Sequence, residues 1–149
     1  LFNRTFYTEE VNRLERNLQR PVSCIFIDLN GLKEINDHFG HDAGDEQLRR
    51  MGNVLTQLIQ NTQYTASRIG GDEFVVLLPN ADEASLQSSL RSLHELMLID
   101  NQYHSIHPIS LSVGHASSRP NERIEDTLRR ADKHMYMQKK QYYARLNPQ

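Results

Sequence analysis

Three carboxylates lie where short apolar runs of the sequence end or turn. Asp28 closes the run 22–28, and Asp72 and Glu73 follow a glycine pair between two other runs. If these runs are neighbouring strands, the three side chains converge at one edge of a sheet. Such oxygen ligands suit Mg²⁺, and two ions would clamp the attacking and leaving oxygens of a phosphoryl or nucleotidyl transfer. The alternative is three ordinary solvated residues at a strand end and a turn.

The segment after Asp28 has the features of a phosphate-binding loop. Residues 29–32 (LNGL) join the first apolar run to an expected helix at 32–39. Their backbone amides and the positive end of that helix are therefore available to anionic oxygens. Lys33, in the first helical turn, could pair with the same phosphates. The alternative is a lysine that lies along the helix surface with its charge in water.

Asn36 and Asp45 could together read the edge of a purine base. A carboxylate accepts hydrogen bonds from the N1 and N2 donors of guanine, and adenine offers no such pair. Each residue also has an ordinary explanation. Asn36 alone would be a polar surface residue, and Asp45 alone could be the N-cap of the following helix.

Other residues give weaker indications of metal or redox chemistry. His104 and His107 are three residues apart, but no cysteine or further histidine flanks them to complete a zinc set. We therefore expect both to be surface residues of a loop before Pro108. The single cysteine, Cys24, cannot form an internal disulfide, which fits a reducing, cytoplasmic setting.

Length and composition exclude several classes of protein. The chain has 149 residues, 38% of them hydrophobic and 24% charged, which predicts one domain over 1–149 with a real core. Its apolar runs fall far short of the roughly 18–20 residues that span a bilayer. Seventeen Lys and Arg against nineteen Asp and Glu leave a net charge of −2, too negative to hold long nucleic acid. The chain opens almost directly in a helical pattern without a signal sequence, so we expect a domain excised from a longer protein.

The spacing of apolar residues predicts the elements that must position these side chains. Helices are expected at 6–18, 32–39, 48–58, 86–97 and 124–135, and strands at 22–28, 65–69, 74–78 and 109–116. The order αβααββαβα predicts an α/β (α+β) fold, a mixed sheet of about five strands covered by helices. The pair Gly70-Gly71 predicts a hairpin, because glycine supplies the positive φ that tight hairpin turns need.

Five sequence blocks resemble the GGDEF domains, the diguanylate cyclases. The signature itself is matched by residues 68–74 (RIGGDEF), and a second block by residues 28–37 (DLNGLKEIND) and 40–45 (GHDAGD). Residues 1–4 (LFNR) with Phe6 resemble the end of the family's first motif. Residues 112–114 (SVG) and 131–136 (ADKHMY) with Lys139 complete the set. The blocks span essentially the whole chain in the family's order and spacing.

The resemblance implies a palm-like fold related to nucleotide cyclases and the condensation of two GTP molecules into cyclic di-GMP with release of pyrophosphate. Because one domain holds one GTP, it also implies an antiparallel homodimer for catalysis. A regulatory or sensor segment is expected upstream of Leu1. This domain itself is expected in the cytoplasm, without contact with a membrane or with long nucleic acid, although the full-length protein could be anchored to a membrane upstream.

Residue by residue, the resemblance assigns metal and catalytic roles to the carboxylates. Asp28, the Leu29 carbonyl, Asp72 and Glu73 would ligate two Mg²⁺ or Mn²⁺ ions, and Asp72 would accept the proton of the attacking 3′-hydroxyl, with Glu73 beside it. Asn36 and Asp45 match the positions that read guanine. The full set implied to bind substrate is Gly31, Leu32, Lys33, Asn36, His41, Asp45, Gly70, Gly71 and Lys139.

Two positions depart from the family pattern. The product-inhibition motif Arg-x-x-Asp reads Asn61-Thr62-Gln63-Tyr64 here, so both charged residues are absent and we expect no feedback inhibition through this site. Tyr143 stands four residues beyond Lys139, where the family often has a phosphate-binding arginine. Affinity for the triphosphate is the property that this second departure affects.

Other functions explain the sequence less well than an active cyclase. The main alternative is a catalytically weak GTP-sensing domain that regulates an attached partner such as a cyclic di-GMP phosphodiesterase. A structural dimerisation domain would leave a costly cluster of like charges without a role. A template-directed polymerase would need fingers, a thumb and a basic channel, for which 149 residues at a net charge of −2 leave no room.

Overall fold

The computed structural model describes residues 1–17 and 20–146 and has the predicted order of elements. Leu18, predicted in the first helix, lies outside the described residues. The helices are α1 (Arg4–Glu15), α2 (Leu32–Phe39), α3 (His41–Ile59), α4 (Glu83–Tyr103) and α5 (Ile124–Leu146). The strands are β1 (Val22–Leu29), β2 (Thr65–Arg68), β3 (Glu73–Pro79) and β4 (Leu111–Ser117).

The four strands form one antiparallel sheet in the order β2-β3-β1-β4. The α/β class is confirmed, but the sheet has four strands rather than about five, and all its strand pairs are antiparallel rather than mixed. Within residues 1–17 and 20–146, the pairing extends beyond these strands through a parallel bridge between Phe2 and Ser67, on the outer edge of β2. The central strand β1 is buried over its whole length, as a strand with both faces covered must be.

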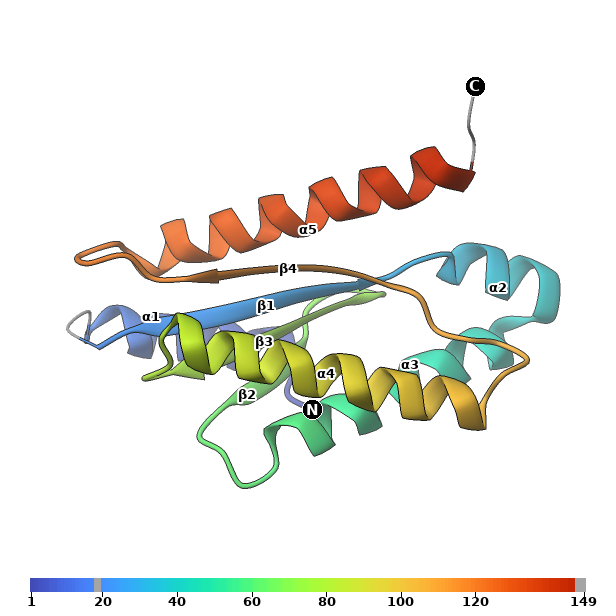
Figure 1. Cartoon of the computed structure of the whole chain (residues 1–149), viewed down its shortest axis with the longest axis horizontal. Coiled ribbons are helices and arrows are strands. Elements are labelled where there is room, and N and C mark those ends of the chain that lie inside the picture. The colour runs from blue at the N-terminus through green and yellow to red at the C-terminus, as the bar shows by residue number, and fades with distance from the viewer. Residues whose placement is uncertain (18–19, 147–149) are drawn as a thin grey trace.

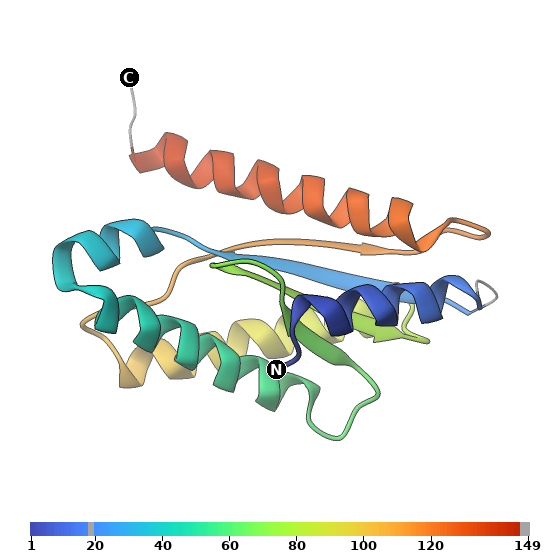
Figure 2. The same cartoon turned by 180° about the vertical axis from the view of Figure 1, so that it is seen from behind.

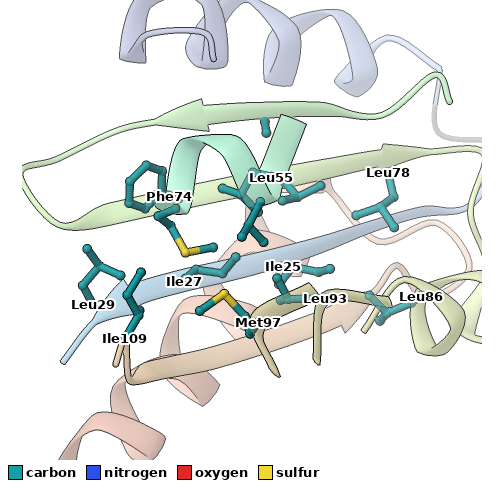
Figure 3. Close-up of a cluster of buried hydrophobic side chains, with 14 of the residues drawn as sticks. Ile25, Ile27, Leu29, Leu55, Phe74, Leu78, Leu86, Leu93, Met97 and Ile109 are labelled. Carbon is teal, nitrogen blue, oxygen red and sulfur yellow. The ribbon is translucent and has the colours of Figure 1, made fainter. Parts of the chain in front are cut away.

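Helices cover both faces of the sheet (Figures 1 and 2). On one face, α3 and α4 pack on alternate residues of the strands, among them Ile25, Ile27 and Phe74 (Figure 3). On the other face, α1 and α5 enclose Cys24, Phe26 and their neighbours. Hydrophobic side chains thus cover both faces of β1 up to its carboxyl end, where Asp28 lies.

The joint between α2 and α3 sets the start of the second helix. Gly40 has φ +90° and ends α2, and α3 begins at the next residue, His41. Asp45 therefore lies inside α3, and the alternative of an N-cap is wrong. Further along α3, the buried Arg50 pairs with Asp100 of α4 at 2.8 Å and donates to the His107 carbonyl at 2.7 Å. These bonds fix α3 to α4 and to the loop before β4.

Side chains of α5 cover the outer edge of β4. The His115 N–H donates to Nδ1 of His134 at 3.2 Å, and the Arg130 guanidinium donates to the Ser117 carbonyl at 2.7 Å. Gly114 of β4 lies against the helix backbone itself, so that a Cβ there would be 2.1 Å from the Ala131 carbonyl oxygen. The helix and strand therefore lie in close contact, and α5 extends toward the end of the molecule where α2 lies (Figure 1).

Glu122 fixes the start of α5 and gives the fold a specific pH dependence. It accepts hydrogen bonds from Arg130 at 2.7 and 3.0 Å, from Thr127 at 2.7 Å and from the Arg119 N–H at 3.1 Å. The bonds from Arg130 above all lower the pKa of Glu122 from 4.5 to about 2. The ionised carboxylate thus stabilises the fold above its ordinary pKa, and this contribution is lost as the pH falls from 4.5 through about 2.

Glu122→Gln is expected to destabilise the protein near neutral pH and to have little effect in strong acid. Urea unfolding at about pH 6, above this transition, and at about pH 2.5, near its lower end, measures the free energy of unfolding of both proteins. We expect the difference between wild type and variant to shrink at the lower pH. A difference that stays the same at both pH values would contradict the assigned role of the ionised Glu122.

In the part of the chain that the structure describes, no helix combines the length and the apolar character needed to cross a bilayer.

Candidate active site

The predicted carboxylates converge at the end of β1. Asp28 is paired with Glu73 in the register of β1 and β3, and the Leu29 N–H donates to the Asp72 carbonyl at 3.0 Å. The Lys139 ammonium reaches this cluster from α5, lying 2.8 Å from Oδ2 of Asp28 and 3.9 Å from Oδ2 of Asp72. The antiparallel pairing of β1 with β3 therefore brings Asp28 close to Asp72, and α5 adds Lys139 to this pair.

Burial and neighbouring charges shift the pKa values of Asp28 and Lys139. Burial raises the pKa of Asp28 to about 6, and the Asp72 charge adds to this, although the bond from Lys139 opposes it. Burial alone would lower the pKa of Lys139, but its hydrogen bond to Asp28 and the charges of both aspartates raise it. Oδ1 of Asp28 is buried without a hydrogen-bond partner.

These observations fit a divalent cation. A buried carboxylate oxygen without a partner beside a second carboxylate is the kind of donor set that Mg²⁺ or Mn²⁺ takes. Among residues 1–17 and 20–146, however, no three His, Cys, Asp or Glu side chains are gathered closely enough to form a complete site as they stand. Lys139 lies between the two aspartates, and its ammonium supplies part of the charge that a cation would bring.

Arginine side chains hold the turn that carries Asp72. Arg68 donates to the Gly71 carbonyl at 2.7 Å and to the Gly70 carbonyl at 3.2 Å. Arg4 donates to the Ile69 carbonyl at 3.0 Å. The sequence arguments gave these two arginines no role, although both belong to blocks that resemble the family.

The hairpin between β2 and β3 is confirmed, but the reason given for it is wrong. Neither Gly70 nor Gly71 has a positive φ. The turn between Arg68 and Glu73 is longer than a two-residue hairpin, so no left-handed residue is required. An added Cβ at Gly71 would meet nothing within 4 Å, which leaves this residue open to solvent or ligand.

The loop after β1 exposes part of the predicted phosphate-binding set. Gly31 has φ +72°, which favours glycine, and it forms the N-cap of α2 without a side-chain cap. Its N–H donates to the Tyr143 hydroxyl at 3.3 Å. Lys33 is exposed, whereas Leu32 packs partly against the core. His41 is exposed in the first turn of α3.

Asn36 and Asp45 occupy different surroundings near the same helix pair. Oδ1 of Asn36 is buried without a hydrogen-bond partner, and this carboxamide lies so close to Gly44 that a Cβ there would be 1.8 Å from it. Asp45 is exposed and lines a cavity of about 520 Å³ together with Phe74 and Arg68. The sequence alone does not single out Gly44, because its close contact with Asn36 appears only in the folded structure.

Gly44→Ala is expected to displace the Asn36 side chain and to weaken guanine binding. Because the overlapping atom is the end of a side chain that can rotate, the fold should survive. We expect a loss of about tenfold in affinity for GTP, the size of one lost hydrogen bond, with little change in thermal stability. Calorimetric titration with guanosine and with GTP tests this. Wild-type affinity for both ligands would contradict the placement of the base beside Asn36.

The structure also shows the surroundings of the product-inhibition positions, of the two histidines and of the cysteine. Asn61 is exposed with φ +63°, and Tyr64 packs partly against the core, so the positions of the product-inhibition motif carry no charge here. His104 is exposed, and the His107 ring lies against Phe39 with centroids 4.4 Å apart. Cys24 is buried, and burial raises the pKa of its thiol to about 12, so it is unreactive.

A second cavity, of about 500 Å³, lies between α4, β4 and α5. It is lined mainly by apolar side chains of α4 and β4 and contains no carboxylate. Its histidines, His94, His115 and His134, are not gathered into a group that could hold a metal ion within the described residues. The cluster at Asp28 and Asp72 remains the candidate active site.

Comparison with known proteins identifies the family of this chain. A family model described as "Diguanylate cyclase, GGDEF domain" matches residues 1–145. The chain is 31% identical over 144 residues to the diguanylate cyclase DgcS of Shewanella oneidensis, covering 93% of this chain and 47% of that protein. It is 37% identical over 132 residues to DgcP of Escherichia coli, covering 85% and 38%. The GGDEF domain of YfiN (TpbB) from Pseudomonas aeruginosa has a similar structure, with a TM-score of 0.80 and 28% identity over 95% of this chain and 91% of that one.

The antiparallel sheet with helices on both faces is a palm-like α/β fold. The chain belongs to the GGDEF domain family. It spans less than half the length of these curated relatives.

Proposed function

We propose that this domain is a diguanylate cyclase, which joins two GTP molecules into cyclic di-GMP and releases two pyrophosphates. The observation that carries the proposal is the shared cation position between Asp28 and Asp72, which Lys139 fills in part. The loop at Gly31 follows directly after β1, which ends beside Asp28. Relatives named diguanylate cyclases at 31–37% identity support the same reaction.

The proposed roles divide between metal, phosphate and base. Asp28, the Leu29 carbonyl and Asp72 would hold two Mg²⁺ or Mn²⁺ ions, with Glu73 beside them. When bound, these ions would neutralise the triphosphate and activate the phosphorus for in-line displacement. Phosphate oxygens would meet the Gly31 and Leu32 amides and the ammonium groups of Lys33 and Lys139, while His41, Gly70 and Gly71 border the bound nucleotide.

The chain's own residues would supply orientation and proton transfer. In each half-reaction, the 3′-oxygen of one GTP bonds to the α-phosphorus of the other, and the bond to pyrophosphate breaks. Asp72 accepts the proton from the 3′-hydroxyl. The carboxamide of Asn36 and the carboxylate of Asp45 would select guanine, because together they present acceptors to N1 and N2.

One domain holds half of the reaction, so the proposal includes a dimer. Two copies would face each other in antiparallel orientation, each presenting one GTP to the other. Positioning two bound substrates for attack is itself a large part of such catalysis. The full protein's sensor segment and its location in the cytoplasm remain parts of this proposal.

The second candidate function is a GTP-sensing domain with weak catalysis. One feature favours it, which is Tyr143 at the family's arginine position.

Product analysis tests the proposed function. The domain is incubated at high concentration with Mg²⁺ and GTP, or with Mg²⁺ and ATP, and the products are separated by chromatography. We expect cyclic di-GMP and two pyrophosphates per product from GTP, and no cyclic dinucleotide from ATP. An equal yield from ATP would contradict guanine selection, and no product from GTP under dimer-forming conditions would favour the sensing function.

A further inference from the structure

Two side chains one turn apart on α5 lie in the candidate active site. Lys139 bonds to Asp28, and Tyr143 accepts a hydrogen bond from the Gly31 N–H at 3.3 Å. The first is a cation beside carboxylates, and the second is a neutral oxygen on a backbone donor of the loop proposed to bind phosphate. The helix α5 thus provides a partner both for the Asp28 carboxylate and for the Gly31 backbone N–H.

The Gly31 N–H cannot serve both Tyr143 and a phosphate oxygen, because one N–H makes one good hydrogen bond. The Tyr143 hydroxyl is a weak partner, since 3.3 Å is at the long end for such a bond and no charge assists it. A phosphate oxygen is charged and makes the shorter, stronger bond. The two partners therefore compete for one donor, and the phosphate has the advantage.

We propose that Tyr143 is a gate on the phosphate loop, whose hydroxyl occupies the Gly31 amide until a nucleoside triphosphate displaces it. The inference rests on the proposed function and adds a regulatory element to that site. At this position the resemblance implies an arginine that would attract phosphate. This chain has Tyr143 instead, and the phosphate must displace its hydroxyl from the Gly31 amide. The gate lowers affinity for the triphosphate without changing the recognition of guanine.

The neighbouring tyrosine supplies a matched control. Tyr142 adjoins Tyr143, with ring centroids 5.1 Å apart, and both are half-buried. Only the hydroxyl of Tyr143 accepts from the Gly31 N–H, whereas that of Tyr142 would come within 3.9 Å of a Cβ at Gly31. Removing either hydroxyl as phenylalanine preserves the ring and its packing, so only the hydrogen bond distinguishes the two variants.

The test is calorimetric titration of wild type, Tyr143→Phe and Tyr142→Phe with two probes in Mg²⁺. One probe is the α,β-methylene analogue of GTP, which resists cleavage, and the other is guanosine, which has no phosphates. We expect Tyr143→Phe to bind the analogue about threefold to tenfold more tightly, as one hydrogen bond allows. Its affinity for guanosine and both affinities of Tyr142→Phe should equal those of wild type.

Several outcomes would overturn the gate. Weaker binding of the analogue by Tyr143→Phe would make the hydroxyl a ligand of phosphate. Equal affinities, or a gain for guanosine as large as that for the analogue, would show that the Gly31 amide is not the point of competition. Failure of wild type and both variants to bind either probe would instead overturn the proposed function, and the gate with it.

Discussion

Replacing Asp72 with asparagine is expected to abolish formation of cyclic di-GMP while leaving the fold intact. The substitution removes a charge from the cation position between Asp28 and Asp72 but changes the side-chain volume very little. It also removes the proposed acceptor for the 3′-hydroxyl proton. We expect a loss of at least about 100- to 1000-fold in the rate, the effect of losing one charge-stabilising group in a transition state. Chromatographic analysis of products from GTP and Mg²⁺ measures it.

A remote carboxylate provides the control for this variant. Asp82 caps α4 by accepting from the Ser85 N–H at 2.9 Å, and asparagine caps a helix about as well as aspartate. Asp82→Asn makes the same chemical change outside the site and should keep wild-type turnover. Thermal unfolding of both variants should lie close to wild type. Full turnover by Asp72→Asn would refute its proposed role in metal binding and proton transfer.

Gly114→Ala is expected to cause the largest loss of stability among single substitutions considered for this chain. A Cβ at this position would be 2.1 Å from the Ala131 carbonyl oxygen and 2.1 Å from the Met135 nitrogen. Both are backbone atoms of α5, so no side chain can rotate away. The helix must move off the sheet, at a cost of about 3 kcal/mol in the free energy of unfolding, the upper part of the range for overpacking. Urea unfolding measures this cost.

Gly52→Ala is the matched control for the stability measurement. Gly52 lies within α3, where an added Cβ would be 3.7 Å from the side chain of Leu1, an ordinary contact. Alanine is the better helix former there, so we expect a gain of about 0.5–1 kcal/mol. Stability of Gly114→Ala equal to or above wild type would contradict the close contact of α5 with β4. Because α5 carries Lys139, which is proposed to contact phosphate, Gly114→Ala should also impair nucleotide binding.

The order of elements could be predicted from the sequence because it depends on local spacing. Apolar residues at helical spacing marked all five helices, and the continuous apolar run ending at Asp28 marked a strand buried on both faces. The convergence of Asp28 with Asp72 followed from one further step, that the two strands are neighbours, which the register of β1 and β3 confirms. Family resemblance then supplied roles that spacing alone left open.

Other features depend on contacts that no local pattern records. Tyr143 meets Gly31 across 112 positions of the sequence, and Asn36 lies on Gly44 only because Gly40 turns the chain sharply between two helices. The glycine pair at 70–71 was misread because the turn is held by Arg68 side-chain bonds rather than by a positive φ. The contact of Tyr143 with Gly31 was missed because it is tertiary, whereas the turn at 70–71 was misread although its bonds are local.

The most direct test of the account is the dependence of cyclic di-GMP formation on protein concentration at saturating GTP and Mg²⁺. A cyclase that works as a dimer of half-sites predicts an initial rate that rises more than linearly with protein until dimers are complete. GTP that is bound but not converted, in a preparation shown by light scattering to be dimeric, would contradict the cyclase and support a GTP-sensing domain.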